Sequence, residues 1–171
     1  MSTFDDIVNR RSIRKYRPEC PDMDLIGKVV SAGVCAPSGK NGQSATIVAV
    51  TNPEEVKYLS RLSSKIKGKD ADTFYGAPAV ILVLADAESP YAVQDGSLVM
   101  GNLMNAAYSL GLGSCWINTL KEIVRLPEWK DILEKWGIKG NFIGVGFCVL
   151  GYPDEQPGMR PRKENYVYYI K

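Results

Sequence analysis

The sequence has 171 residues, which suits one domain with a hydrophobic core of its own. Its 21 Lys and Arg residues nearly balance 19 Asp and Glu residues, so the net charge of +2 argues against a generally basic nucleic-acid-binding protein. The chain has no histidine, which excludes Ser-His-Asp and Cys-His catalysis and metal sites with imidazole ligands.

Hydrophobic periodicity and breaker residues divide the chain into helices and strands. Polar residues that can cap a helix stand before the first three helices, and short β-branched or apolar runs mark the strands. The expected elements, in chain order, are a helix capped by Ser2 or Thr3 and ending at Asn9, a helix from Asp22 or Asp24 to about Ala36, a strand over 44–50, a helix from Asn52 to about Ser63, a strand over 77–86, a helix over 93–113, a strand over 114–118, a helix from Leu126 to Gly137, and a strand over 142–152.

The composition of several of these segments predicts whether they are buried in the fold. Residues 44–50 and 77–86 read as buried strands, and the second is apolar throughout, as in a central strand covered on both faces. The helix over 93–113 is apolar almost all round and is expected to be buried on all sides, in part by another subunit. Gly144 and Gly146 indicate a bulge or a close backbone approach. The order of elements favours an α+β or α/β fold with helices covering a mixed sheet.

Two segments read as irregular. The polar, glycine-broken stretch 64–75 is expected to be a loop, of a length that is often functional or mobile. The tail after residue 152 is broken by prolines and ends in the aromatic, strand-like run 166–170. Such a run needs a surface to lie on, and pairing with a sheet edge of another subunit would supply one.

The four cysteines point to a cytoplasmic protein with reduced thiols. Cys20, Cys35, Cys115 and Cys148 are widely spaced and form no CxxC pair, so we expect no zinc site. The N-terminus, MSTFDDIVNR, does not resemble a secretory signal, and no apolar run reaches the roughly 18 residues of a membrane-spanning helix. Each cysteine is interpreted first as a small buried side chain.

The stretch NRRSIRKY, residues 9–16, concentrates cations near the start of a nearly neutral chain. Arg10 and Arg14 are four residues apart and would share a face if the first helix continued through them. Ser12 adds a hydroxyl and a backbone N–H, so the group suits a phosphate or an anionic heterocycle. The alternative is a solvated basic face at a helix end, which a run of cations by itself favours.

The stretch APSGKNGQ, residues 36–43, holds the side chains of Ser38, Asn41 and Gln43. Hydroxyl and amide groups both donate and accept hydrogen bonds, so they suit a ring edge with alternating C=O and N–H groups, such as the pyrimidine side of a flavin. A plain polar connector is the alternative. The stretch is not a P-loop, because it lacks the GxxxxGK[ST] spacing.

Two further stretches are glycine-rich or basic. GLGSCWIN, residues 111–118, lies between a helix and a strand, which reverses the order of a dinucleotide-binding fingerprint, so Gly111 and Gly113 are interpreted as a helix C-cap. The tail stretch RPRKENY either solubilises the tail or forms a second clamp on the anion bound by the first arginines. Its cations are Arg160, Arg162 and Lys163.

Taken together, the chain resembles the nitroreductase family of FMN-dependent oxidoreductases over essentially its whole length. It contains, in the family's order, the stretches RRSIRKY, APSGKNGQ, FYGAPAVILVLAD, DGSLVMGNLMNAAYSLGLGSCWI and PRKENY. The resemblance implies an α+β fold with a mixed, mainly antiparallel sheet flanked by helices. It also implies a single domain over residues 1–171, an intertwined homodimer with two FMN sites at the interface, and a tail, residues 153–171, that wraps the partner subunit.

The resemblance further implies which residues bind FMN. One group would hold the phosphate, ribityl chain and pyrimidine edge: Arg10, Arg11, Ser12 and Arg14. A loop would approach the flavin from the other subunit: Pro37, Ser38, Gly39, Asn41 and Gln43. A third segment would lie beside the ring and offer a backbone amide near flavin N5: Trp116, Ile117 and Asn118. The tail would add phosphate-binding cations: Arg162 and Lys163.

The implied activity is electron transfer from NADH or NADPH, through flavin N5, to a nitroaromatic, quinone or similar small-molecule acceptor by a ping-pong mechanism. No side chain acts as a catalytic residue in this reading, no metal is needed, and neither nucleic acid nor membrane is a partner. The alternatives are a flavin-fragmenting or reductive dehalogenating enzyme on the same fold, a flavin-binding redox module with little turnover, and a soluble domain whose basic stretch grips nucleic acid.

The sequence departs from the family pattern on the substrate side. Ser44 and Ala45 stand where many members have Pro-Trp. Larger members carry an inserted helical lid, for which only residues 64–75 and the helices after Asn118 are candidates here. We therefore expect an open substrate pocket.

Overall fold

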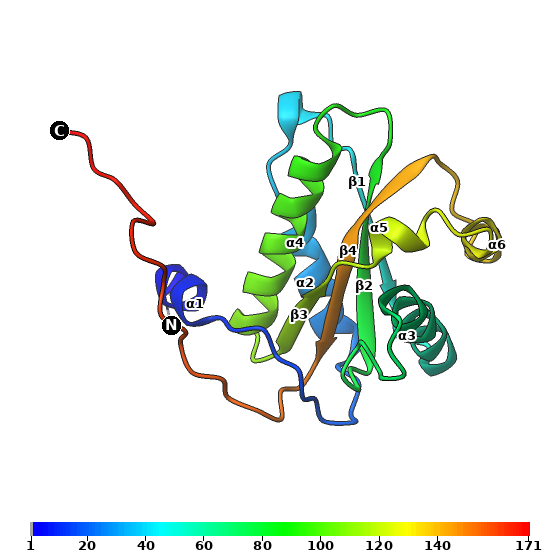
Figure 1. The fold of residues 1–171 in the computed structure, drawn as a ribbon, viewed down its shortest axis with the longest axis horizontal. Helices are drawn as coiled ribbons and strands as arrows, with labels where there is room; N and C mark the ends of the chain where they lie inside the picture. The colour runs from blue at the N-terminus through cyan, green and yellow to red at the C-terminus, as the bar shows by residue number, and fades with distance from the viewer. Residues whose placement is uncertain (1) are drawn as a thin grey trace.

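Four antiparallel strands form the middle layer of the structure, a computed structural model that describes residues 2–171 (Figure 1). They lie in the order β1-β2-β4-β3, and a parallel bridge between Ser12 and Ser114 makes the sheet mixed. The expected α+β fold is confirmed. The elements are α1 (Thr3–Asn9), α2 (Met23–Val34), η1 (Gly39–Asn41), β1 (Ala45–Val50), α3 (Pro53–Lys67), β2 (Ala79–Asp86), α4 (Ala92–Ser109), β3 (Gly113–Ile117), α5 (Leu120–Ile123), α6 (Glu128–Lys135) and β4 (Phe142–Gly151).

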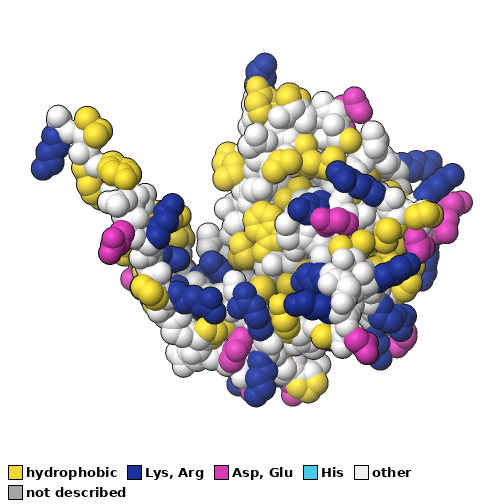
Figure 2. Space-filling view, viewed as in Figure 1, with side chains coloured by type: hydrophobic (Ala, Val, Ile, Leu, Met, Phe, Trp, Pro, Cys, Tyr) yellow, Lys and Arg dark blue, Asp and Glu magenta, His cyan; other side chains and the backbone are white. Residues whose placement is uncertain are grey.

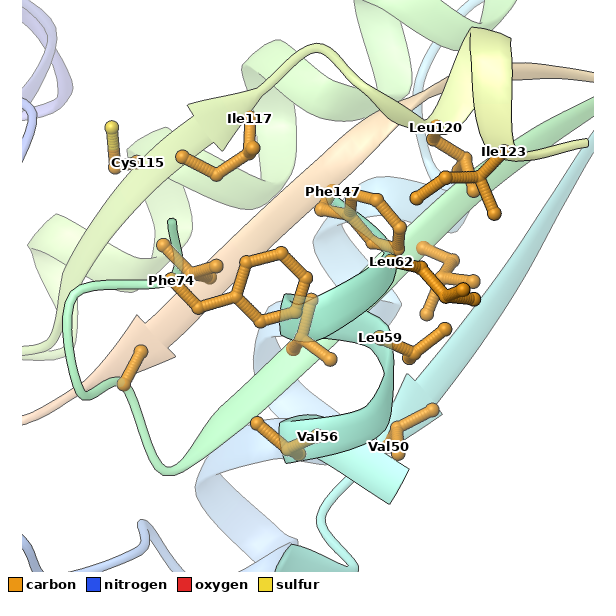
Figure 3. Close-up of a cluster of buried hydrophobic side chains, with 14 of the residues drawn as sticks. Val50, Val56, Leu59, Leu62, Phe74, Cys115, Ile117, Leu120, Ile123 and Phe147 are labelled. Atoms are coloured by element: carbon orange, nitrogen blue, oxygen red, sulfur yellow. The ribbon is translucent and has the colours of Figure 1, made fainter. Parts of the chain in front are cut away.

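Each face of the sheet carries its own hydrophobic core, because the side chains of β2 are apolar on both faces of the strand. Val80, Leu82 and Leu84 join the cluster that packs against α3, part of which Figure 3 shows. Ile81 and Val83 point the other way and join the cluster under α2 and α4. All five side chains are at most 1% exposed. The prediction of a central strand buried on both faces is therefore confirmed.

Side-chain caps begin the first three helices where the sequence predicts them. The Ser2 hydroxyl accepts a hydrogen bond from the Asp5 N–H at 3.2 Å, and the Asp5 carboxylate accepts one from the Ser2 N–H at 3.1 Å, which makes a capping box. Asp22 caps α2 and Asn52 caps α3 through their side-chain oxygens. These local contacts explain why the helix starts could be predicted from sequence.

The end of α3 lies about one turn beyond its predicted end at Ser63. Ile66 packs against the hydrophobic cluster, which extends the helix to Lys67. Gly68 then terminates it in the left-handed conformation, with φ +60°, at no steric cost. The expected loop over 64–75 therefore begins only at residue 68.

Two predictions about strands and helices are corrected. The run over 44–50 was expected to be a buried strand, but β1 lies at the edge of the sheet, and only Val50 of its six residues is buried. A β-branched run looks the same at an edge as at the centre, because strand order depends on distant partners. The short helix α5 was not predicted at all.

The apolar helix α4 is covered on one side only within this chain. Its buried residues, among them Met100 and Leu103, face the sheet and α2. Val93 and Leu98 remain 59% and 47% exposed. The expectation that α4 is buried on all sides is wrong for the single chain, and its coverage by a second subunit stays a prediction.

The glycines before β3, at its start and within β4 serve different purposes. Gly111 follows the C-cap residue Leu110 of α4 with φ +76°, so it lies at the helix end as expected, but Gly113 does not: it opens β3, where a Cβ atom would lie 2.9 Å from Ile13 Cγ1. In β4 the pairing register shifts so that Val83 faces Gly146 and Leu84 faces Gly144, which confirms the expected bulge. The bulge and the missing side chains let other segments approach β4 closely.

The tail leaves the body of the molecule and runs past α1 to an isolated C-terminus (Figure 1). Residues 160–171 are all exposed, and the expected strand over 166–170 does not form within this chain. A strand needs a partner for its backbone groups, and the tail has none here. Within residues 2–171, no helix combines the length and apolarity needed to cross a membrane.

Candidate functional site

The basic segment after α1 is extended, so the predicted helix end at Asn9 is confirmed and Arg10 and Arg14 do not share a helical face. α1 ends at Asn9, and Arg10 already has extended backbone angles, φ −54° and ψ 133°. Ser12 then bridges to Ser114 of β3, and the Ile13 N–H donates to the Ser114 carbonyl at 3.0 Å. In an extended chain alternate residues share a side. Arg10, Ser12 and Arg14 can therefore still face one ligand, for a different reason.

These three residues all act on the pKa of Cys115, as does Lys67 at the end of α3. Burial raises the pKa of the Cys115 thiol, while the charges of Arg14, Lys67 and Arg10 and a hydrogen bond from Ser12 act to lower it. The charges of Arg10, Arg14 and Lys67 therefore act on the same thiol. We call this set of five residues the Arg10 site. The sequence analysis missed Lys67, for which the only signal was its place in a basic helix end.

Arg10 itself is half-buried and incompletely satisfied. Its Nη1 atom is buried and has no hydrogen-bond partner among residues 2–171. Burial lowers the pKa of Arg10, and the neighbouring positive charge of Arg11 lowers it further. A buried guanidinium that lacks an acceptor costs stability, so it fits a bound anion such as a phosphate.

Of the other predicted cations, Arg162 acts on Arg10, whereas Arg11 and Lys163 make contacts elsewhere. Arg162 in the tail is exposed, yet its charge contributes to lowering the pKa of Arg10, so the two lie on the same side of the molecule. The Arg11 guanidinium instead donates to the Val8 carbonyl at 2.8 Å and to the Arg10 carbonyl at 2.7 Å, where it closes the end of α1. Lys163 lies 5.4 Å from the centroid of the Tyr166 ring.

The predicted loop 36–43 is far from the Arg10 site. Its Gly39 N–H donates to Asp95, in the first turn of α4, at 2.8 Å. The segment around Arg10 instead shares a cavity with Tyr108, in the last turn of α4, through Asn9, Arg11 and Ile13. α4 has 18 residues, so its two ends lie roughly 25 Å apart. One chain therefore does not bring the two halves of the predicted site together.

Within that loop, the predicted ligand groups bond mainly to one another. The Gln43 N–H donates to the Ser38 hydroxyl at 3.0 Å, and the Gln43 amide donates to Asn41 at 3.3 Å. Asn41 and Gln43 have positive φ values, 55° and 48°. Gly39 packs on Tyr91, where a Cβ atom would lie 2.4 Å from the ring, and Pro37 is exposed. The loop is thus a shaped, exposed surface.

In the segment 116–118, Asn118 is the residue whose side chain is exposed to a possible ligand. Ile117 is buried on the α3 side of the sheet, with Cys115. The Trp116 side chain lies on the opposite face, where its indole N–H donates to the Val145 carbonyl at 3.3 Å. Asn118 is exposed at the end of β3. Of the three predicted residues, only Asn118 has a side chain free for a ligand.

A strained turn borders the Arg10 site and was not predicted. Tyr75 has φ +60°, unusual for a bulky residue, and its ring centroid lies 6.0 Å from the Arg14 guanidinium carbon. The Asp72 carboxylate holds the turn by accepting hydrogen bonds from the Phe74 N–H at 2.9 Å and the Gly76 N–H at 2.5 Å. A strained backbone conformation that hydrogen bonds hold in place is common at binding sites.

Alkaline pH is expected to destabilise the fold in part through Tyr16. Its phenol is buried and donates to the Ile13 carbonyl at 2.8 Å. Burial raises the pKa of Tyr16 far above its unfolded value of about 10. Stability contributed by a raised pKa is present below the unfolded pKa and lost as the pH rises beyond it, at up to about 1.4 kcal/mol per pH unit.

Tyr16→Phe should therefore lose about 1 kcal/mol at pH 8, because one hydrogen bond disappears. Above pH 10 its melting temperature should fall less steeply than that of the wild type. Circular dichroism melts at several pH values measure both effects. Burial also raises the pKa of Cys148, to about 12, but this contribution is common to both proteins. Equal slopes would contradict the role of Tyr16.

Comparisons with known proteins identify the family to which the chain is similar. A sequence profile described as "Nitroreductase family" matches residues 7–71 and 60–152. A putative NADH dehydrogenase/NAD(P)H nitroreductase from Methanothermobacter thermautotrophicus is 30% identical over 169 residues, which cover 94% of this chain and 82% of that protein. A crystal structure of a nitroreductase with bound FMN from Bacteroides fragilis is 25% identical, with a TM-score of 0.90 over 100% of both chains. An iodotyrosine deiodinase from Thermotoga neapolitana is 24% identical over 97% of this chain and 96% of its own.

These matches span the described fold from α1 to β4, and the matched residues include the whole segment that carries Arg10, Ser12 and Arg14. The chain belongs to the nitroreductase family.

Proposed function

We propose that this protein is an FMN-dependent oxidoreductase that takes electrons from NAD(P)H. The relatives support this class, since the curated relative is named for NAD(P)H nitroreductase and the similar crystal structure holds FMN. Within this chain the observation that carries the proposal is the buried, unpartnered Nη1 of Arg10 beside Ser12 and Arg14. A phosphate would supply the missing acceptor, so these residues fit FMN.

Different residues of the site would bind different parts of FMN, according to their charge and position. Arg10 and Arg162 would hold the phosphate, and Ser12 would donate or accept a further hydrogen bond. Arg14 and Lys67 would stabilise negative charge on the ring system, which favours the reduced cofactor. When bound, FMN would supply the redox chemistry between NADH or NADPH and a nitroaromatic, quinone or similar acceptor, in ping-pong order. Solvent water can supply the protons, so the reaction needs no histidine, and the chain has none.

The complete site requires a homodimer in this proposal. The loop 36–43 lies at the opposite end of α4 from Arg10, so it would reach the cofactor of the partner subunit. Val93 and Leu98 of α4 are exposed apolar residues that a partner would cover, and the exposed tail 153–171 would wrap that partner. Residues 1–171 would then form one domain of a cytoplasmic dimer.

The visible spectrum of the purified protein tests the proposal first. We expect two flavin bands, and about one FMN per subunit released on heat denaturation. NADH and NADPH oxidation with menadione then tests turnover, and light scattering tests the dimer. A protein that stays colourless after FMN is added would contradict the proposal. A yellow protein without turnover would instead favour a flavin-binding redox module.

Reductive dehalogenation is a second candidate, because the chain and the Thermotoga neapolitana deiodinase match over nearly their full lengths. Incubation of the dithionite-reduced protein with 3-iodotyrosine tests it. Release of iodide faster than from free reduced FMN would favour this activity over nitroreduction.

A further inference from the structure

A cavity of about 870 Å³ lies beside the Arg10 site and takes no part in it. One face of α3, the loop 68–78 and residues 18–20 enclose it, and we call it the α3 groove. Its volume falls within the range of about 300–1,000 Å³ that small-molecule sites occupy. Pro18, Pro53 and Pro78 supply accessible apolar surface on its walls. The groove can therefore bury a flat, apolar body.

The rim of the α3 groove is strongly basic. Lys57, Arg61 and Lys65 follow one another at intervals of four along α3 and so share one face, and Lys69, just beyond the end of the helix, also lines the groove. Figure 2 shows Lys and Arg side chains gathered over α3. In residues 2–171, neither Arg61 nor Lys69 has a carboxylate oxygen within 4.0 Å. These cations are free to bind an anion.

The acidic residues of the α3 groove do not cancel this charge. Asp70 and Asp72 line it against four cations, Lys57, Arg61, Lys65 and Lys69, which leaves an excess of two positive charges. Asp72 also accepts hydrogen bonds from the Ser60 hydroxyl and from the N–H groups of the turn. Lys57 pairs with Glu54 at 3.4 Å and Lys65 with Glu128 at 3.9 Å, both exposed contacts that contribute little. An apolar cleft with an excess of cations at its rim fits a ligand with an aromatic body and several phosphate oxygens.

One loop separates the α3 groove from the Arg10 site. Tyr75 lies against Arg14, whereas its neighbours Phe74 and Gly76 line the groove. Consecutive Cα atoms are only about 3.8 Å apart, so the two sites share a thin wall. Likewise Lys67 acts on Cys115 while Lys65 lines the groove. A ligand that is long enough to cross this loop can occupy both sites at once.

We propose that the α3 groove binds the adenosine-phosphate end of the electron donor, and that its cations select NADPH through the additional 2′-phosphate. This inference rests on the proposed function and names the donor that the enzyme uses. The adenine lies against the apolar walls, and Arg61, Lys65 and Lys69 bind the phosphates. The nicotinamide end reaches across the turn at Tyr75 towards the Arg10 site.

Charge reversal at Arg61 tests the α3 groove in the FMN-loaded protein. The probe for direct binding is adenosine 2′,5′-bisphosphate, measured by calorimetry, and steady-state kinetics use menadione as acceptor. Arg61→Glu should weaken bisphosphate binding by about tenfold or more and raise the KM for NADPH by a similar factor. The KM for NADH should change much less, and the effect should fall on KM rather than on kcat. Added salt should weaken bisphosphate binding to the wild type.

Matched variants separate the α3 groove from general effects of charge or folding. Lys28→Glu changes an exposed lysine on α2, across the sheet, and should leave bisphosphate binding unchanged. Arg61→Lys should retain most of the affinity. If Arg61→Glu fails to fold, the Lys65→Ala/Lys69→Ala double variant replaces it, with the same expectation.

The two proposals fail in different ways. Unchanged bisphosphate affinity and NADPH KM in the groove variants, in a protein that contains FMN and oxidises NADPH, would overturn the groove and leave the proposed function intact. Equal effects on NADPH and NADH would overturn the selection for the 2′-phosphate. If the wild type oxidises neither donor, the proposed function fails, and the donor assignment fails with it.

Discussion

Arg10→Ala is expected to yield a protein that folds but purifies with most of its FMN lost. The guanidinium of Arg10 offers a buried donor without a partner, and Ser12 and Arg14 lie beside the same sulfur atom. A hydrogen bond to a charged group contributes about 1.5–3 kcal/mol. Its loss in Arg10→Ala should therefore raise the dissociation constant for FMN roughly 10- to 150-fold. Fluorescence titration of the apoprotein with FMN measures this change, and the flavin-to-protein ratio reports it directly.

For Arg10→Ala we also predict an unusual effect on the stability of the apoprotein. Because Nη1 of Arg10 is buried and unsatisfied, its removal should not lower the melting temperature of the FMN-free protein. A residue with a purely structural role would behave in the opposite way. Arg10→Lys keeps the charge but loses the planar fork, so its affinity should fall between those of wild type and Arg10→Ala.

Two further variants complete this test. Arg162→Ala should also lose FMN, since Arg162 lies close enough to act on Arg10. Arg17→Ala removes an exposed arginine from the same segment and should keep FMN, which controls for net charge. Full flavin occupancy in both Arg10→Ala and Arg162→Ala would show that the phosphate is held elsewhere.

Phe147→Ala should destabilise the protein by about 3–5 kcal/mol, a large part of the stability of a domain of this size. Phe147 is fully buried on β4, in the middle of the cluster that packs under α3 (Figure 3). Its ring centroid lies 5.0 Å from that of Phe74, with the planes tilted by 58°. Removal of the ring would leave a cavity between the sheet and the loop 68–78. Urea unfolding measures the free-energy difference.

Phe147→Leu is the matched control, because it keeps most of the apolar volume and should cost far less than Phe147→Ala. Phe74→Ala, alone and combined with Phe147→Ala, gives a double-mutant cycle in which the ring pair should account for about 0.5–1.5 kcal/mol. Phe74 also anchors the turn at Tyr75, so its loss should speed amide exchange over residues 68–78. A cost below about 1.5 kcal/mol for Phe147→Ala would mean that the cluster repacks around the gap.

The sequence by itself determined the kinds of element, most of their boundaries, and the chemistry available to the site. The caps at Ser2, Asp22 and Asn52 act on N–H groups within three residues, so a local pattern suffices to predict them. The unbroken apolar run of β2 likewise indicates a strand covered on both faces. The resemblance to a known family supplied the candidate residues, of which Arg10 and Ser12 now lie near one point.

Only the tertiary structure decided which of these residues are neighbours. Residues 10–14 could have continued α1, but pairing with Ser114 of β3 draws them into an extended segment. Lys67 and Tyr75 join the site because α3 and the following turn pack back on the sheet. Within one chain the loop 36–43 stays apart from this site, because it is bound to the opposite end of α4. Such contacts join segments far apart along the chain. They depend on how the whole core packs, and tertiary packing of this kind overrides what local propensity favours.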